Sequence, residues 1–132
     1  MALVLVGPVN SFVVGGPPVD ISGKFPGAAN RMLTRFADAS GSPQLSAVSS
    51  ICTHRQCPIL TGSAQWNTTP HPIYDSATRV ITCPCHLSQF NVQTGAVVHG
   101  PAQFALPTFA VQIKGADVYV DSDSEAANAG VA

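Results

Sequence analysis

The chain has 132 residues, with six Lys or Arg against seven Asp or Glu, so its formal net charge is −1. This length is enough for one domain with a real hydrophobic core. The balanced charge gives no basic surface of the kind that binds nucleic acid. Charged residues make up only 10% of the chain, against a usual quarter. Either a partner covers much of the surface, or uncharged polar side chains solvate it.

No apolar run approaches the roughly 18 residues that a transmembrane helix needs. The segment Met1–Val6 is apolar, but it is short and lacks basic residues. It therefore does not match a secretory signal peptide.

Short β-branched stretches bounded by Gly, Pro, Asn and Asp predict strands throughout the chain. The predicted strands, in chain order, are Leu3–Val6, Ser11–Val14, Met32–Phe36, Gln44–Ile51, Thr78–Thr82, Gln89–Val92, Ala96–Val98, Phe109–Ile113 and Val118–Val120. Turn residues at Asp38–Pro43 and Lys114–Asp117 predict links between neighbouring strands. A helix would also fit Ala28–Phe36. Residues 121–132 are small, polar and acidic, which predicts a frayed tail.

All four cysteines fall in two short blocks. The first block runs from Cys52 through His54 to Cys57, and the second runs from Cys83 through Cys85 to His86. Each block can supply one thiolate and one imidazole, which makes a two-Cys, two-His metal site. Zinc uses the same ligand types, but its usual first half is C-x2–4-C rather than C-x-H. A zinc site would also leave one cysteine in each block without a role.

The two blocks resemble those of the Rieske iron–sulfur proteins, specifically the disulfide-containing branch of quinol:cytochrome c-type complexes and some oxidase small subunits. In a Rieske [2Fe–2S] cluster, two thiolates bind one iron and two histidines bind the other. The resemblance implies that Cys52 and Cys83 bind the inner iron. His54 and His86 would then bind the outer, solvent-near iron.

The resemblance also implies a disulfide between Cys57 and Cys85. Because disulfides persist in oxidising compartments, we expect an extracytoplasmic protein, periplasmic or membrane-associated. The alternative is two reduced cysteines in a cytosolic protein. Proteins of this branch often carry an N-terminal anchor or export signal. The chain is then either a trimmed soluble fragment or an anchorless protein that a partner holds.

Residues after the second block match the family in part. Ser88 matches a serine whose hydroxyl donates to a bridging sulfide. Phe90 stands where the family has a tyrosine that donates to a cysteine sulfur, and a phenyl ring cannot donate. Leu87 replaces a glycine, which favours a different local backbone path. The run Gly100–Ala102 and the later Pro107 match a loop that covers the cluster.

Two features bear on the partner. The family has an apolar Leu-Gly pair at the tip of the first block, where this chain has Arg55 and Gln56. A charge there is costly to bury in an apolar quinol pocket and suits a polar protein partner better. The 25 residues between Cys57 and Cys83 are either a partner-contact loop or a tolerated surface insertion.

The resemblance implies an all-β Rieske fold in a single domain. An antiparallel β-sandwich base (about 1–49 and 104–120) would carry an inserted cluster-binding subdomain at about 50–103. It implies one-electron transfer, as a subunit or soluble component of a respiratory-type oxidoreductase, between a donor subunit and a cytochrome or copper acceptor. We expect no catalysis by the chain alone. The alternatives are an assembly subunit with a mainly structural cluster, and a structural zinc-binding module.

Overall fold

The computed structural model describes residues 3–25, 30–53, 59, 73–83 and 88–121. These residues form three antiparallel sheets and two single-turn 3-10 helices, Val9–Ser11 and Ser22–Lys24. The predicted all-β class is confirmed. Within the described residues, no helix is long and apolar enough to cross a membrane.

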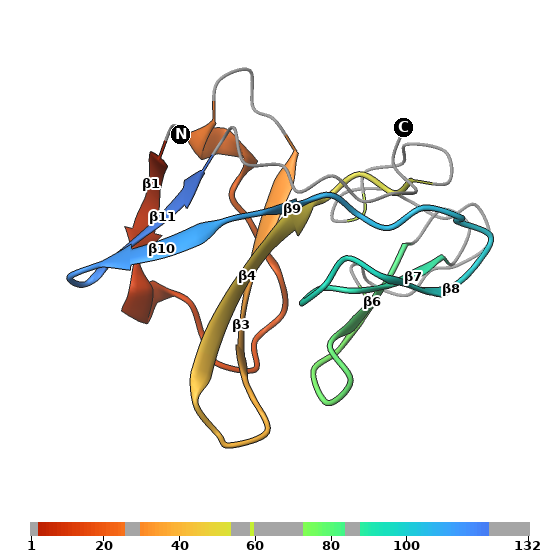
Figure 1. The fold of residues 1–132 in the computed structure, drawn as a ribbon, viewed down its shortest axis with the longest axis horizontal. Coiled ribbons are helices and arrows are strands. Elements are labelled where there is room, and N and C mark those ends of the chain that lie inside the picture. Colours follow the sequence, from red (N-terminus) through yellow and green to blue (C-terminus); the bar gives the residue numbers. More distant parts are fainter. Residues whose placement is uncertain (1–2, 26–29, 54–58, 60–72, 84–87, 122–132) are drawn as a thin grey trace.

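The three sheets lie in a row across the molecule (Figure 1). The first has the order β1 (Leu3–Pro8), β11 (Asp117–Asp121), β10 (Val111–Lys114). The middle sheet has the order β2 (Val19–Asp20), β3 (Arg31–Ala37), β4 (Pro43–Ser49), β9 (Thr108–Phe109). The third has the order β5 (Ile73–Asp75), β6 (Val80–Thr82), β7 (Gln89–Asn91), β8 (Val97–His99). Both chain ends therefore contribute to the first sheet, while the third sheet comes from one internal segment.

The middle sheet supplies side chains to two separate cores. Leu33 pairs with Ala47 across β3 and β4, and both pack with Val118 and Val120 of the first sheet. The neighbouring pair, Met32 and Val48, packs instead with residues of the third sheet. Because successive strand residues face opposite sides, the β3–β4 hairpin packs against the first sheet on one face and against the third sheet on the other.

Side-chain contacts also join the middle and third sheets. The buried Ser46 hydroxyl of β4 donates to the Val92 carbonyl just beyond β7, at 2.8 Å. The Arg79 guanidinium lies over the Phe36 ring of β3, 5.1 Å from its centroid. These contacts fix the third sheet against β3 and β4.

Several strand predictions need correction. Ser11–Val14 is a 3-10 turn and irregular chain, because Phe12 is buried while Val13 and Val14 are exposed and no strand pairs with them. Phe109–Ile113 is divided between β9, which pairs with β4, and β10, which pairs with β11. Strands β2 and β5 were missed because they span only two and three residues. The described part of Ala28–Phe36 is strand, not helix.

Candidate functional site

Cys52 lies just after β4, at the start of the first cysteine block. Cys52 is only 1% exposed. The Ile59 amide donates to the Ser50 carbonyl at 2.8 Å, which brings the chain beyond the block back to the end of β4. Ser50 and Ile59, which flank the block, are thus hydrogen-bonded to each other.

Cys83 follows β6 directly and is fully buried. Strands β6 and β7 pair with Thr82 opposite Gln89, and the Cys83 amide donates to the Ser88 carbonyl at 2.7 Å. Side chains alternate across a strand, so Thr82 and Gln89 face one side while Cys83 and Ser88 face the other. The hairpin therefore presents Cys83 and Ser88 together toward the interior.

The two blocks meet in one hydrophobic cluster. Cys52 and Cys83 belong to it together with Phe90, Ala102 and Leu106. This places two cysteines from distant parts of the sequence in the same apolar environment. Phe90 is fully buried there, so the position that carries a tyrosine in the family lies in the thiol-containing core.

The segment 100–106, called here the covering loop, is bound to both blocks. The Thr53 hydroxyl, next to Cys52, donates to the Phe104 carbonyl. The Ala102 amide donates to the Ser88 hydroxyl oxygen at 3.0 Å in a buried position. One loop therefore holds the two thiol-bearing segments through one hydrogen bond to each.

The far end of the covering loop is held by Gly95. The Leu106 amide donates to the Gly95 carbonyl at 2.7 Å. Gly95 has φ +78, and a Cβ built on it would lie 2.2 Å from the Leu106 carbonyl oxygen. Only glycine fits this close approach of two backbones. The sequence analysis did not single out Thr53 or Gly95. For Gly95, the turn-forming residues that precede it could have indicated a tight turn.

The structure leaves part of the predicted site outside its described residues. His54, Cys57, Cys85 and His86 fall there. Their roles as ligands and as a disulfide pair therefore stay predictions. Among the predicted site residues, Cys52, Cys83 and Ser88 are described, and all three lie in the same buried region.

One titratable group borders this core. Tyr74 of β5 packs against the cluster, and its hydroxyl has no hydrogen-bond partner among the described residues. Burial raises the pKa of the Tyr74 phenol, and the Arg79 charge partly opposes that shift. The phenol therefore stays neutral at physiological pH.

The described residues fit an iron–sulfur cluster. Two buried thiols on separate segments are suited to a soft metal. Ser88 accepts a hydrogen bond from Ala102, and no described residue accepts its own hydroxyl hydrogen. A buried hydroxyl with a donor to spare suits an acceptor such as a sulfide, because leaving that donor unpaired would be costly.

Comparisons with known proteins agree with this arrangement. The family model of the Rieske [2Fe-2S] domain matches residues 27–110. The Rieske iron–sulfur subunit of the cytochrome bc1 complex of Streptomyces lividans is 38% identical over 68 residues, covering 51% of this chain and 33% of the relative. The cytochrome b6-f complex iron–sulfur subunit of Prochlorococcus marinus is 35% identical over 88 residues, covering 67% and 40%. The chain thus spans about a third to two fifths of these relatives.

Solved structures share the fold. The ferredoxin of carbazole 1,9a-dioxygenase from Nocardioides aromaticivorans has a TM-score of 0.67 at 21% identity, covering 91% of this chain and 97% of that one. A cyanobacterial plasma membrane Rieske protein from Synechocystis has a TM-score of 0.56 at 25% identity, covering 90% and 99%. The fold is therefore found both in a ferredoxin and in a membrane-associated protein.

Proposed function

The chain belongs to the Rieske [2Fe–2S] domain family, and on that premise we propose that it is a one-electron carrier with no catalytic activity of its own. The bound [2Fe–2S] cluster supplies the redox couple, while the protein sets its exposure, potential and docking. The observation that carries the proposal is the burial of Cys52 and Cys83 in one hydrophobic cluster. The covering loop is hydrogen-bonded to the segments of both cysteines.

We propose Cys52, His54, Cys83 and His86 as the ligands, with Ser88 donating to a cluster sulfide. Each cysteine block supplies one Cys and one His, which is the Rieske ligand set. The burial of Cys52 and Cys83 supports their assignment to the inner iron. Family membership favours this reading over the zinc alternative.

We propose that Cys57 and Cys85 form a disulfide that ties the two blocks, and that the protein works in an extracytoplasmic compartment. Support comes from the placement of one further cysteine in each block and from the persistence of disulfides in oxidising compartments. Mass spectrometry of the aerobically purified holoprotein tests the bridge. Two alkylatable thiols at these positions would contradict it.

We propose that the partners are a donor subunit and a cytochrome or copper acceptor of a respiratory-type oxidoreductase. Relatives that are subunits of cytochrome bc1 and b6-f complexes support this choice. The domain division proposed from the sequence is a cluster-binding subdomain at about 50–103, set in a base of about 1–49 and 104–120. The third sheet, which starts at Ile73 and ends at His99, fits within that insert.

Protein-film voltammetry of the holoprotein tests the function. A carrier gives a reversible one-electron wave, with a midpoint well above that of an all-Cys ferredoxin. The wave should persist over repeated cycles, because the buried thiols protect the cluster from solvent. A cluster that is intact by absorption but gives no reversible wave would favour the alternative of an assembly subunit with a structural cluster.

A further inference from the structure

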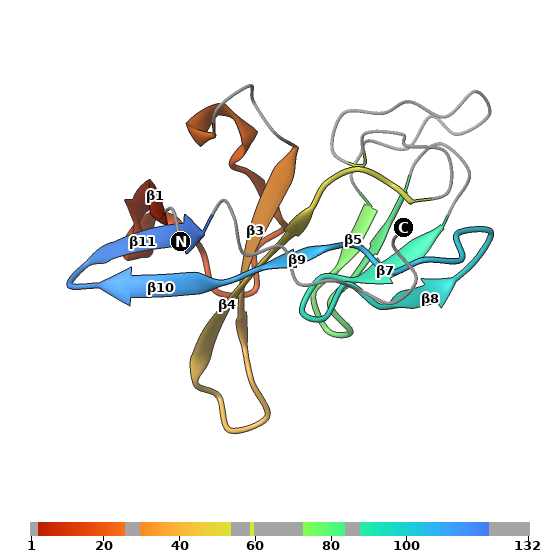
Figure 2. The ribbon, with the colours of Figure 1, turned by 45° about the horizontal axis from the view of Figure 1, so that its top comes forward.

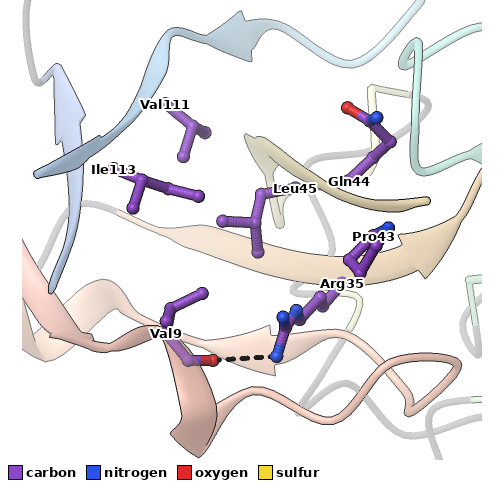
Figure 3. A pocket seen from close by; sticks show the side chains of 7 residues that line it. All are labelled: Val9, Arg35, Pro43, Gln44, Leu45, Val111 and Ile113. Atoms are coloured by element: carbon purple, nitrogen blue, oxygen red, sulfur yellow. Dashed lines mark hydrogen bonds between the residues drawn. The ribbon is translucent and has the colours of Figure 1, made fainter. Parts of the chain in front are cut away.

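A groove of about 270 Å³ lies on the base, between β10 and β4 (Figure 3). Its lining residues come from β3, β4, β10 and the 3-10 turn that begins at Val9, and none of them belongs to the third sheet. The first and third sheets lie on opposite sides of β3 and β4 (Figures 1 and 2). The groove is thus separate from the proposed cluster site.

The wall of the groove is aliphatic. Leu45 of β4 and Val111 and Ile113 of β10 point toward one another across it (Figure 3). Leu45 and Val111 pack against the base core, but Ile113 is 55% exposed. An exposed aliphatic side chain beside an apolar hollow offers surface that a partner's side chain can cover.

One end of the groove carries a positive charge. The Arg35 Nη1 donates to the carbonyls of Val9 and Phe12 at 3.2 and 3.1 Å. A guanidinium has five N–H donors, and the Nε and Nη2 of Arg35 donate to no other described residue. The nearby Asp38 carboxylate is instead bound by Ser40, Ser42 and Gln44. Arg35 therefore has donor capacity for an external acceptor.

Size and charge together restrict the occupant. The volume of about 270 Å³ lies below the roughly 300–1,000 Å³ of pockets that enclose drug-sized ligands or cofactors. Because Leu45, Val111 and Ile113 line it, we take it to accept an aliphatic side chain rather than a whole ligand. The planar guanidinium at its end is matched in geometry and charge by a carboxylate.

We propose that this groove docks a segment of a partner protein in which an acidic side chain lies two positions from a large aliphatic one. In an extended segment, residues two apart face the same side. The aliphatic side chain would fill the hollow between Leu45 and Ile113, while the carboxylate pairs with Arg35. Binding here leaves the third sheet and the covering loop accessible, so one surface anchors the chain while another exchanges electrons.

The test is an NMR titration of the ¹⁵N-labelled full-length holoprotein with the peptide acetyl-Ser-Glu-Ser-Leu-Ser-amide. The amide shifts should change at Val111–Lys114 and at Gln44 and Leu45. The matched peptide with Gln in place of Glu should bind about two- to fivefold more weakly, which is the contribution of a partly exposed ion pair. Arg35→Gln should remove that difference between the two peptides.

A second variant separates binding from folding, because Arg35 also holds two backbone carbonyls. Ile113→Ser changes an exposed side chain and should weaken both peptides, whereas Leu5→Ser, at an equally exposed position outside the groove, should not. Equal binding of the two peptides, or shifts confined to other surfaces, would overturn the proposal. Concentration-dependent shifts without peptide, or peptide-induced shifts in residues 122–132, would assign the groove to a second copy or to the chain's own tail and would also overturn it.

Discussion

At the scale of single residues, Ser88 links the covering loop to the proposed cluster. Its oxygen accepts the Ala102 amide, so its own hydrogen is available to a sulfide. A hydrogen bond donated to the cluster stabilises the reduced state, which is the more negative one. On the proposed assignment, Ser88 would therefore affect both the midpoint potential and the position of the covering loop.

Ser88→Ala should lower the midpoint potential by tens of millivolts up to about a hundred. This range follows because a hydrogen bond to a charged group contributes roughly 1.5–3 kcal/mol, of which only the difference between redox states counts. Protein-film voltammetry gives the midpoint. Ser46→Ala is the control, since it removes another buried hydroxyl bond, to Val92. An equal shift in both variants would refute a direct role for Ser88.

Phe90 is fully buried in the hydrophobic cluster that also contains Cys52 and Cys83. Phe90→Tyr should raise the midpoint potential by tens of millivolts, because the added hydroxyl can donate to a cysteine sulfur. Voltammetry on the variant with normal cluster absorption is the check. An unchanged midpoint would mean that the ring does not face a cysteine sulfur and that the alignment of this strand to the family is wrong there.

At the scale of elements, the covering loop depends on a close backbone contact at Gly95. The Cβ of any other residue would meet the Leu106 carbonyl oxygen, and Leu106 is fully buried in the cluster that includes Cys52 and Cys83. A shift of Leu106 would be transmitted along the covering loop to Ala102 and Phe104, which are hydrogen-bonded to Ser88 and Thr53.

Gly95→Ala should destabilise the fold by about 2–4 kcal/mol, from a positive φ and a backbone clash together. Gly41→Ala is the matched control, because Gly41 has φ +86 and nothing within 4 Å of the added carbon. It should cost only about 1 kcal/mol. Denaturant unfolding measures both. Equal losses would mean that the contact between Gly95 and Leu106 adds nothing beyond backbone strain.

The sequence predicted the longer strands well and the short ones poorly. β3 and β4 were predicted because the turn residues at Asp38–Pro43 separate two stretches rich in apolar residues, and the structure covers both faces of this hairpin. β2 is exposed on both residues, so it has no hydrophobic pattern to detect. The assignment of Cys52 and Cys83 to one iron came from the resemblance of their blocks to the family, and it stays a prediction. Thr53 was not singled out, because its hydrogen bond to Phe104 joins residues 51 positions apart and no local pattern encodes it.

At the scale of the whole molecule, the low charge limits the long-range electrostatic attraction between this protein and its partners. A net charge of −1 with only 10% charged residues creates a weak long-range field, so electrostatic steering should be small. Among the described surfaces, the apolar groove beside Arg35 and the exposed Phe104 of the covering loop offer contact surface instead.

Electron transfer from the reduced protein to ferricyanide and to a cationic cobalt complex should therefore depend weakly on salt. Each second-order rate constant should change by less than about threefold between roughly 0.01 M and 1 M ionic strength, a range over which strongly steered reactions change far more. Stopped-flow kinetics gives both constants. Steep changes of opposite sign for the two reagents would reveal a charged docking face that the composition does not indicate.

The central claim is that two cysteines and two histidines hold a [2Fe–2S] cluster. The most direct measurement is electron–nuclear double resonance on the dithionite-reduced holoprotein, prepared with ¹⁵N-labelled histidine. The account predicts a reduced-cluster signal coupled to nitrogens of two histidines, and loss of the cluster in both His54→Ala and His86→Ala. A signal without histidine coupling, or zinc in place of iron with no signal, would contradict it.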